Sequence, residues 1–593
     1  MNTSARLSSG SMRPVPRLIA SVALYLAAGA AQAAVVQKVE VVGLDEAMRE
    51  NVYRSLTLVD AIGRDVSGRR MAYLVREAED EAREALQPFG YFSPVVEVGR
   101  DRDNGTVTIT IDPGQPVRVV GFRVEVEGEG GDDDTLGEAL AAFRPRPGDV
   151  FDSVLYDGSK AAITGTLAQR GYFDAQLLAH RVEVTRGKYR ADIDLRWNSG
   201  ERYALGAVTF EQDPAIIRPQ LLQKLVTWEP GDPFEALHID RLRTSLASLD
   251  YFGSIAVEAT PQSEGGYKEV PVHVALTPAP RSIYSAGLSF GTESGAGVRL
   301  GVERRYLNSR GHKALAQVDW AEQRKTLTLQ YRVPAFAWLD GWYTASLQFA
   351  DEQTDYMDNR RAEFVFSRSG EINPHLTAIA SVHLLRERWA YTGDLENPGY
   401  RYGSFSFPEL SAEYIDVDDR LYPRAGLGGT LRLRAAPGFG TDASFGQLYA
   451  RASWFHGLGP DSRMIVRGEL GHTWTDELTD LPPSLRFYAG GARSIRGYDY
   501  REVGPRIGDF GIGGRNLVTA SGEYERYFNA SWGGAVFVDS GSAFNGRTPD
   551  WHTGVGVGVR WRSPVGPVKL DIARGLDDPR SSFTLGLSFG AEF

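Results

Sequence analysis

The chain has 593 residues, with 65 lysines and arginines against 76 aspartates and glutamates, and it has no cysteine. The absence of cysteine excludes structural disulfides, thiol catalysis and cysteine-ligated zinc. The formal net charge is −11 and no patch is rich in lysine or arginine, so the sequence gives little support for nucleic-acid binding.

The first 33 residues have the pattern of a secretory leader. Arg6, Arg13 and Arg17 are followed by an apolar run over residues 18–31, and Ala31-Gln32-Ala33 matches a small-x-small cleavage pattern. A membrane anchor is the alternative, but the run is too short to span a bilayer. Residues 1–33 are therefore predicted to be a signal peptide. No later segment approaches the ~18 uncharged apolar residues of a spanning helix, so membrane insertion would require a β-barrel.

The part of the chain before residue 280 contains a repeat. Each repeat unit has an amphipathic helical pattern, then a tyrosine-phenylalanine pair, then a strand pattern, and the phenylalanines Phe92, Phe173 and Phe252 are 81 and 79 residues apart. We interpret the aromatic pairs as core packing. The pattern predicts three β-α-α-β-β domains. Their predicted bounds are residues 34–113, 114–199 and 200–280.

Residues 281–593 are predicted to form an all-β transmembrane barrel. Every odd position from Phe583 to Phe593 is apolar and every even position is small or polar, which gives a strand one apolar and one polar face. The same alternation recurs upstream, as where Leu431 and Leu433 alternate with arginines. Because arginine is costly against lipid, we expect the arginine-bearing face to line an aqueous lumen. At roughly 20 residues per strand and connection, the segment accommodates about sixteen antiparallel strands.

Two segments of this barrel carry a motif. The first is Ile495-Arg496-Gly497-Tyr498, and the second is Phe537-Val538-Asp539-Ser540-Gly541, with Glu523 one strand earlier. Together with the repeats, they make the mature chain resemble the outer-membrane assembly superfamily that includes BamA and TamA, in which POTRA repeats precede a sixteen-stranded barrel. BamA-like members typically carry five repeats and two-partner secretion transporters carry two, so three repeats resemble the TamA branch.

The resemblance implies a role for the two motifs. Arg496 would lie in an extracellular loop that folds into the lumen, where its planar guanidinium would engage Asp539 and Glu523. Gly497 would allow a tight backbone turn, and Tyr498 would pack on the barrel wall. The alternative is a solvated loop arginine and an ordinary lumen aspartate. The expected role is structural. The residues assigned to this lock are Ile495, Arg496, Gly497, Tyr498, Glu523, Asp539 and Gly541.

Two G-x-S-x-G patterns lie in the predicted first and last barrel strands. A serine-hydrolase nucleophile would need a strand-turn-helix elbow, whereas both copies continue an alternating strand. There is also no H-E-x-x-H or phosphate-loop motif, so we expect no enzyme activity, cofactor or metal. Glycines weaken strands, so these two strands are expected to form a weak lateral seam. Its assigned residues are Gly287, Ser289, Gly291, Gly586, Ser588, Gly590 and Phe593.

The function implied by the resemblance is assembly of client outer-membrane proteins, such as autotransporters, through this seam. The implied partners are unfolded clients, outer-membrane lipid and a TamB-like periplasm-spanning protein of the inner membrane, with the repeats in the periplasm. One alternative is a closed anchor or conduit for such a partner in lipid transport. Another is a polypeptide-secreting pore. The sequence does not separate these readings.

Overall fold

The computed structural model describes residues 34–589 with short gaps. The chain divides into two compact units, with the division between Arg202 and Tyr203. The predicted signal peptide, Gly590 and Phe593 lie outside the described residues. The gaps are residues 102, 265, 292–293, 337–339, 355–356, 392–398, 439, 508–509, 564–565 and 578–582.

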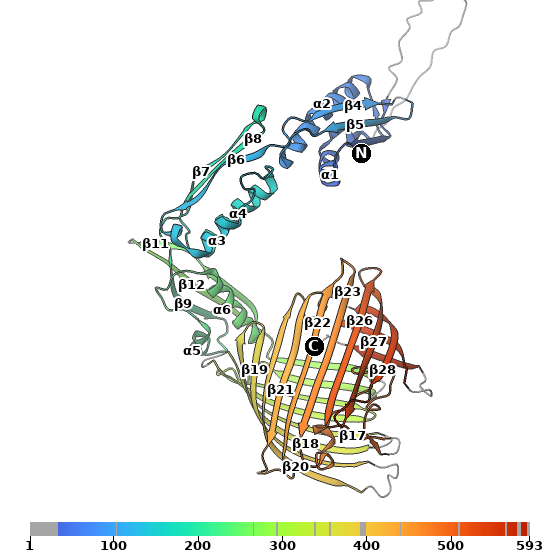
Figure 1. The fold of residues 1–593 in the computed structure, drawn as a ribbon. Helices are drawn as coiled ribbons and strands as arrows, with labels where there is room; N and C mark the ends of the chain where they lie inside the picture. Colours follow the sequence, from blue (N-terminus) through green and yellow to red (C-terminus); the bar gives the residue numbers. More distant parts are fainter. Residues whose placement is uncertain are drawn as a thin grey trace, which may run out of the picture. The chain divides into compact units, whose positions relative to one another are not determined.

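The first unit contains two β-α-α-β-β folds in succession (Figure 1). In the first fold, Asp45 and Ser67 accept hydrogen bonds from backbone amides at the starts of the two helices, which fixes where each helix begins. The apolar stripe of α2, from Met71 to Leu86, is buried against the sheet. The elements are β1 (Ala34–Val35), β2 (Lys38–Val42), α1 (Glu46–Ser55), β3 (Asp65–Val66), α2 (Gly68–Leu86), β4 (Val95–Arg100) and β5 (Thr106–Asp112), with sheet order β2-β5-β4.

The second fold repeats this plan, and its first and last strands pair in parallel. Asp133 and Asp152 cap its helices, and Tyr172 of the aromatic pair is buried in the core. The Asp133 carboxylate accepts a hydrogen bond from Arg170 at 2.9 Å, and although burial opposes it, this contact lowers the pKa of Asp133 below its ordinary value. The elements are β6 (Arg118–Glu127), α3 (Asp134–Ala142), α4 (Ser153–Gln169), β7 (Gln176–Thr185) and β8 (Arg190–Asn198).

The second unit begins with a third fold of this kind. Its helix α6 buries Ile239, Leu242 and Leu246, and β9 pairs in parallel with β12. The elements are β9 (Ala204–Gln212), α5 (Pro219–Leu222), α6 (Ala236–Ser248), β10 (Phe252–Ala259), β11 (Gln262–Glu264) and β12 (Tyr267–Pro278).

The rest of this unit is a sixteen-stranded antiparallel sheet that curls into a barrel (Figure 1). The predicted fold class, α+β repeats followed by an all-β barrel of about sixteen antiparallel strands, is confirmed. The strands are β13 (Ser282–Gly291), β14 (Gly295–Arg304), β15 (Lys313–Ala321), β16 (Arg324–Pro334), β17 (Gly341–Gln353), β18 (Met357–Asn373), β19 (Leu376–Tyr391), β20 (Arg401–Val417), β21 (Gly426–Ala436), β22 (Phe445–Gly457), β23 (Ser462–Trp474), β26 (Asn516–Tyr527), β27 (Trp532–Phe544), β28 (His552–Ser563), β29 (Gly566–Gly575) and β30 (Thr584–Phe589).

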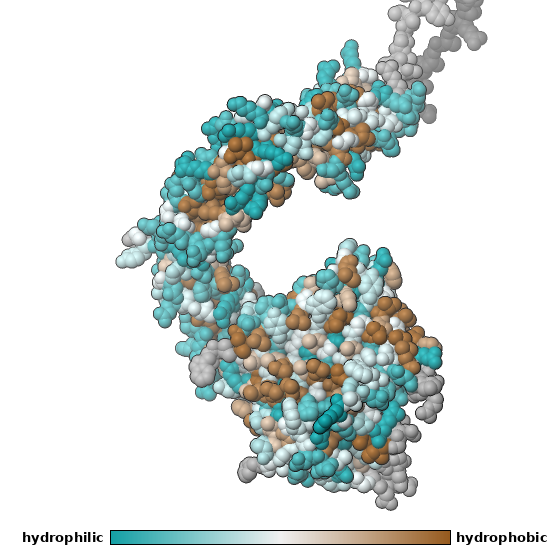
Figure 2. All heavy atoms as spheres, viewed as in Figure 1, coloured by the Kyte–Doolittle hydropathy of each residue, from teal (hydrophilic) through white to brown (hydrophobic). Residues whose placement is uncertain are grey.

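Alternation along each strand divides the barrel residues between two faces. Leu431 and Leu433 on β21 are exposed on the outside of the barrel. Arg434 on the same strand faces inward and pairs with Glu409 on β20 at 2.6 Å. Hydrophobic side chains gather on the outer surface of the barrel in Figure 2. This is the pattern of a sheet with lipid outside and a polar lumen. None of the described helices is long and apolar enough to cross a membrane.

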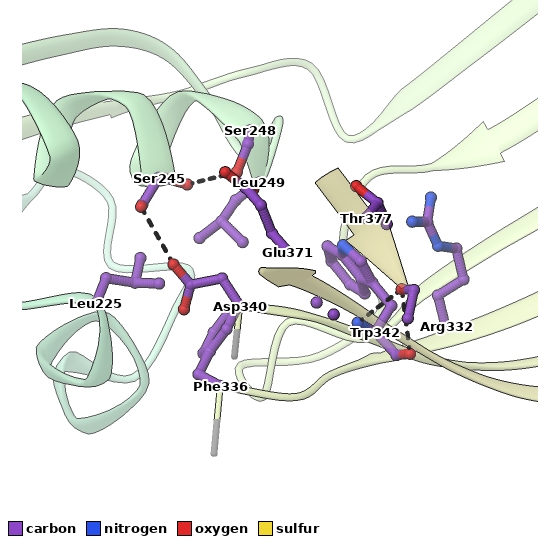
Figure 3. Close-up of a pocket in the computed structure, with 13 residues that line it drawn as sticks. Leu225, Ser245, Ser248, Leu249, Arg332, Phe336, Asp340, Trp342, Glu371 and Thr377 are labelled. Carbon is purple, nitrogen blue, oxygen red and sulfur yellow. Dashed lines mark hydrogen bonds between the residues drawn. The ribbon is translucent and has the colours of Figure 1, made fainter. Parts of the chain in front are cut away.

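The third fold is attached to turns at one end of the barrel. The buried Tyr251 hydroxyl donates to the carbonyl of Gly311 in the β14–β15 turn, and Arg305 of that turn pairs with Asp250 at 2.9 Å. Burial raises the pKa of Tyr251 above its ordinary value, so this hydroxyl keeps its proton. On α6, Ser245 donates to Asp340 at 3.3 Å, beside a cavity of about 240 Å³ (Figure 3).

Candidate functional site

The candidate site is the long connection between β23 and β26, residues 475–515, which we call the inserted loop; it includes the short strands β24 (Arg506–Ile507) and β25 (Phe510–Gly511). Ser484 of this loop donates to the buried Glu387 on β19, and Arg501 pairs with Glu352 on β17 at 3.4 Å. Arg496 contacts β26, β27 and β29. The loop therefore bonds inward residues on well-separated parts of the wall, which places it in the lumen.

Arg496 of the inserted loop donates five side-chain hydrogen bonds. Its Nε and one Nη donate to the two oxygens of Asp539 at 2.6 and 2.8 Å, which is the bidentate geometry of an arginine-carboxylate pair. Its other Nη donates to Glu523 at 2.9 Å. The guanidinium lies 3.3 Å from the centre of the Phe537 ring, so the aromatic face covers one side of the cation. The structure thus brings Arg496, Asp539 and Glu523 together, as the two motifs led us to expect.

A second arginine, Arg560 on β28, shares the same carboxylates. It donates to Glu523 at 2.6 Å, to Glu525 at 2.8 Å and to Asp571 at 2.6 Å, and only 2% of its side chain is exposed. Asp571 also accepts from Arg496 at 3.3 Å, so it links the two arginines. The sequence analysis did not assign Arg560 to the site.

Two further arginines, on β23, bond the same acids. Arg463 pairs with Glu525 at 2.6 Å, and Arg467 donates to Glu523. We call this set the ion cluster; its members are Arg463, Arg467, Arg496, Arg560, Glu523, Glu525, Asp539 and Asp571. Each acid is bonded to at least one arginine, which is the condition for keeping charge buried at moderate cost. The signal that could have found it is the spacing of Glu523 and Glu525, which puts both on one strand face.

Glycines on the wall make room for the inserted loop. A Cβ on Gly554 of β28 would lie 1.8 Å from the Arg496 carbonyl oxygen, and one on Gly575 of β29 would lie 2.6 Å from the Tyr498 ring. Gly497 has φ +98°, a left-handed backbone that favours glycine, and its carbonyl accepts from the Gly575 amide at 3.1 Å.

The other residues assigned to the lock are Tyr498, Ile495 and Gly541. Tyr498 is buried, and its hydroxyl is 3.2 Å from both the Thr553 carbonyl and the Asp577 carboxylate. Ile495 is fully buried in a small apolar cluster with Phe487 and Leu517. Gly541 lies on β27 two residues beyond Asp539, packed against β26 rather than against the inserted loop.

The seam residues lie on the strands that begin and end the sheet. Gly287, Ser289 and Gly291 are in β13, and Gly586 and Ser588 are in β30. β13 pairs with β14 and β30 pairs with β29, but among the described residues no ladder joins β13 to β30. A Cβ on Gly586 would be 3.4 Å from Ala492 of the inserted loop, so the last strand also touches this loop.

The described side chains offer no catalytic or metal-binding arrangement. Ser289 and Ser588 lie within strands, not at the strand-turn-helix elbow of a hydrolase. Across the described ranges, no group of three or more histidine or acidic side chains is placed to hold a metal ion. What the arrangement does provide is a bonded connection between the inserted loop and five strands, β23, β26, β27, β28 and β29.

Comparisons with known proteins agree with this architecture. Residues 307–591 match the model of the Omp85 superfamily domain, and residues 38–113 match the model of the first POTRA domain of TamA. The first of these matches covers just under half of the chain. The crystal structure of BamA from Haemophilus ducreyi lacking POTRA domains 1–3 is similar in fold, with a TM-score of 0.61 and 16% identity, over 80% of this chain and 99% of that one.

Two relatives are outer membrane protein assembly factors named BamA. The protein from Nitratidesulfovibrio vulgaris (strain Hildenborough) is 24% identical over 59% of this chain and 46% of its own length. The protein from Neisseria meningitidis serogroup B is 21% identical over 83% of this chain and 70% of its own length. The chain thus spans about half of the first relative. An Omp85 barrel preceded by POTRA folds is an outer-membrane protein with its repeats in the periplasm, as predicted.

Proposed function

We propose that this chain is an outer-membrane assembly factor of the TamA type. It would assist insertion or translocation of client outer-membrane proteins, autotransporters among them, through a lateral seam between β13 and β30. The TamA-type POTRA match at residues 38–113 supports the branch. The BamA relatives and the Omp85 domain support the general role. The periplasmic repeats would receive unfolded clients and a TamB-like partner that spans the periplasm.

The observation that carries the proposal is that no ladder joins the two edge strands within the described residues. β13 (Ser282–Gly291) pairs with β14, and the described part of β30 (Thr584–Phe589) pairs with β29. An exposed sheet edge pairs readily with an incoming strand, so such an edge can template the strand of a client. Energy for insertion would come from burial of apolar client surface in lipid and from completed strand pairing.

The inserted loop would keep the barrel in shape while the seam works. Its ion cluster holds β23, β26, β27, β28 and β29 as one block through buried, mutually bonded charges. Such a block would resist deformation of the wall next to β30, so opening would be confined to the edge itself. This lock is a structural role and requires no cofactor.

A disulfide across the seam tests the proposal. The chain has no cysteine, so each introduced pair is unique. We would combine cysteines at Ser285 or Gly287 with cysteines at Gly586 or Ser588 and select the pair that closes completely. The matched control is Gly428→Cys with Ser453→Cys, which are directly opposite on the β21–β22 ladder.

The readout is surface display of an autotransporter client with and without reductant. The proposal expects the seam disulfide to abolish display, reductant to restore it, and the control disulfide to have no effect. Normal display by the locked barrel would reject the seam and favour the closed anchor or conduit. High ion conductance of the locked barrel with continued client export would favour the secreting pore.

A further inference from the structure

The outer face of the barrel carries an unusual row of charged residues on β16 to β19. Residues directly opposite on neighbouring strands share a face, and this row lies on the same outward face as apolar residues such as Leu327 and Phe349. The ladders give the row as Trp320, Lys325, Asp351, Arg360, Arg388 and Tyr402. The adjacent row on the same outward face, two residues closer to the middle of each strand, is Val318, Leu327, Phe349, Ala362, Arg386 and Ser404.

Four cations thus face outward where lipid is expected. Outward positions on β21 and β22 show the usual pattern, since Leu427, Leu431, Leu433, Ala450 and Trp454 are all apolar. An arginine facing lipid is costly at depth and becomes tolerable near the interface or beside an anion. The charged row therefore needs an explanation that the rest of the wall does not.

The charged row lies at the extracellular ends of its strands. The opposite ends, at the β14–β15 and β16–β17 turns, contact the periplasmic third repeat through Gly311 and Asp340. Lys325 follows the β15–β16 turn, and Arg360 and Arg388 lie near the other ends of β18 and β19. The cations are therefore placed at the level of the outer leaflet.

Local partners neutralise these cations only in part. Arg360 pairs with Asp351 at 3.3 Å, and Arg388 lies 3.4 Å from Asp358. The two carboxylates leave an excess of two positive charges in the group of four cations. Arg386 bonds the neutral hydroxyl of Ser404 at 2.6 Å. Within the described structure, the buried Nε of Arg388 has no hydrogen-bond partner.

A depression adjoins the cations. Its volume is about 700 Å³, and it is lined by apolar side chains, including Trp320, Leu327 and Phe349, together with all four cations. A second depression of about 290 Å³ shares Ala362 and Arg386 with it. The remaining outward residues of this second depression are Leu347, Phe364, Leu384, Ser404 and Ser406.

We propose that this face binds one phosphate-bearing lipid of the outer leaflet, with the headgroup on Lys325, Arg360, Arg386 and Arg388 and the acyl chains along the two depressions. Guanidinium groups bind phosphate oxygens in pairs, and a basic pocket on a membrane protein is a typical headgroup site. The apolar floor explains why the ligand is a lipid and not a free anion. Trp320 and Tyr402 frame the site with amphipathic rings suited to the interface.

The first test needs no variant of the protein. The full-length protein in detergent is titrated with labelled lipopolysaccharide, with the same material after removal of its lipid A phosphates, and with inorganic phosphate as competitor. The proposal expects at least tenfold weaker binding after dephosphorylation and no competition by millimolar inorganic phosphate. Equal binding of the dephosphorylated lipid, or displacement by inorganic phosphate, would overturn it.

The second test locates the site. The double variant Arg360→Gln, Arg386→Gln should bind lipopolysaccharide at least tenfold more weakly than wild type. The matched control is Arg574→Gln, an exposed arginine at the extracellular end of β29, and it should stay within twofold of wild type. Heat-modifiable migration of each variant on gels verifies that the barrel is folded. Unchanged binding by the folded double variant, or an equal loss in the control, would reject this location.

Discussion

Replacing Arg496 with alanine tests the ion cluster most directly. The side chain is 7% exposed and makes five donor contacts, two of them to Asp539. Glu523 would keep Arg467 and Arg560, so its charge stays compensated. Among the described residues, Asp539 would keep the Ser521 hydroxyl at 2.6 Å and the backbone amide of residue 496 at 3.0 Å.

The expected loss of stability follows from the Asp539 carboxylate, which would lose its arginine while Glu523 keeps two. Removing one partner of a buried ion pair typically costs about 3–5 kcal/mol, and the surviving partners of Glu523 place Arg496→Ala near the lower end, about 3 kcal/mol. Arg496→Lys keeps the charge but loses the bidentate fork, so we expect about 1–2 kcal/mol. The assay is the urea dependence of the compact, heat-modifiable form in detergent, from midpoint and slope.

The control for this prediction is Arg493→Ala, three residues earlier in the inserted loop and exposed. A surface substitution of this kind should stay within about 0.5 kcal/mol of wild type. If Arg496→Ala and Arg493→Ala unfold at the same urea concentration, the ion cluster does not hold the inserted loop in place.

Three further predictions concern other parts of the chain. Gly575→Ala would put a Cβ 2.6 Å from the Tyr498 ring and should lower the free energy of unfolding by about 1–3 kcal/mol in the same urea assay. Gly546→Ala, whose Cβ would have no atom within 4 Å, should leave the free energy of unfolding unchanged. Equal effects of the two substitutions would contradict the steric argument. Because the folded-state pKa of Asp133 is lowered, its carboxylate stabilises the second repeat at pH values above the ordinary aspartate pKa, and this stabilisation is lost as the pH falls below about 4. Hydrogen exchange of the α3 amides should therefore increase at low pH in the wild type and not in Asp133→Asn. Identical pH profiles of exchange in the two proteins would refute this prediction. Tyr251→Phe removes a buried hydroxyl donor and should raise hydrogen exchange in turn 305–312 by an amount equivalent to about 1 kcal/mol, so an unchanged rate would count against that contact.

The sequence predicted the barrel because one face of each strand must meet lipid and the other water. That constraint repeats every second residue, so it is visible as alternation without any knowledge of pairing. The fold class followed from it, whereas the estimate of about sixteen strands followed from the length of the segment, and the sheet has sixteen strands. The motif around Arg496 pointed to Asp539 and Glu523, and these residues lie within bonding distance.

Other features depended on register, which alternation does not give. Arg560 reaches Glu523 only because β26, β27 and β28 align with a particular offset, and a shift of one residue would turn either side chain outward. The expectation that strand arginines face the lumen also fails at Arg386 and Arg388. Both arginines are an even number of residues from the outward Leu384, so alternation along the strand places them on the outer face. The expectation that strand arginines face the lumen excluded that interpretation.

The attachment of the third repeat has a mechanical consequence for the barrel. Its contacts reach the turn after β14 and the turn after β16, which lie on the β13 side of the sheet. The ion cluster instead ties together β23 to β29, on the β30 side. The two sides of the sheet are therefore held by different sets of contacts, those of the third repeat at the periplasmic rim and those of the ion cluster in the lumen. If the proposed seam opens, neither set of contacts would have to break, and a force on the third repeat would reach the sheet on its β13 side.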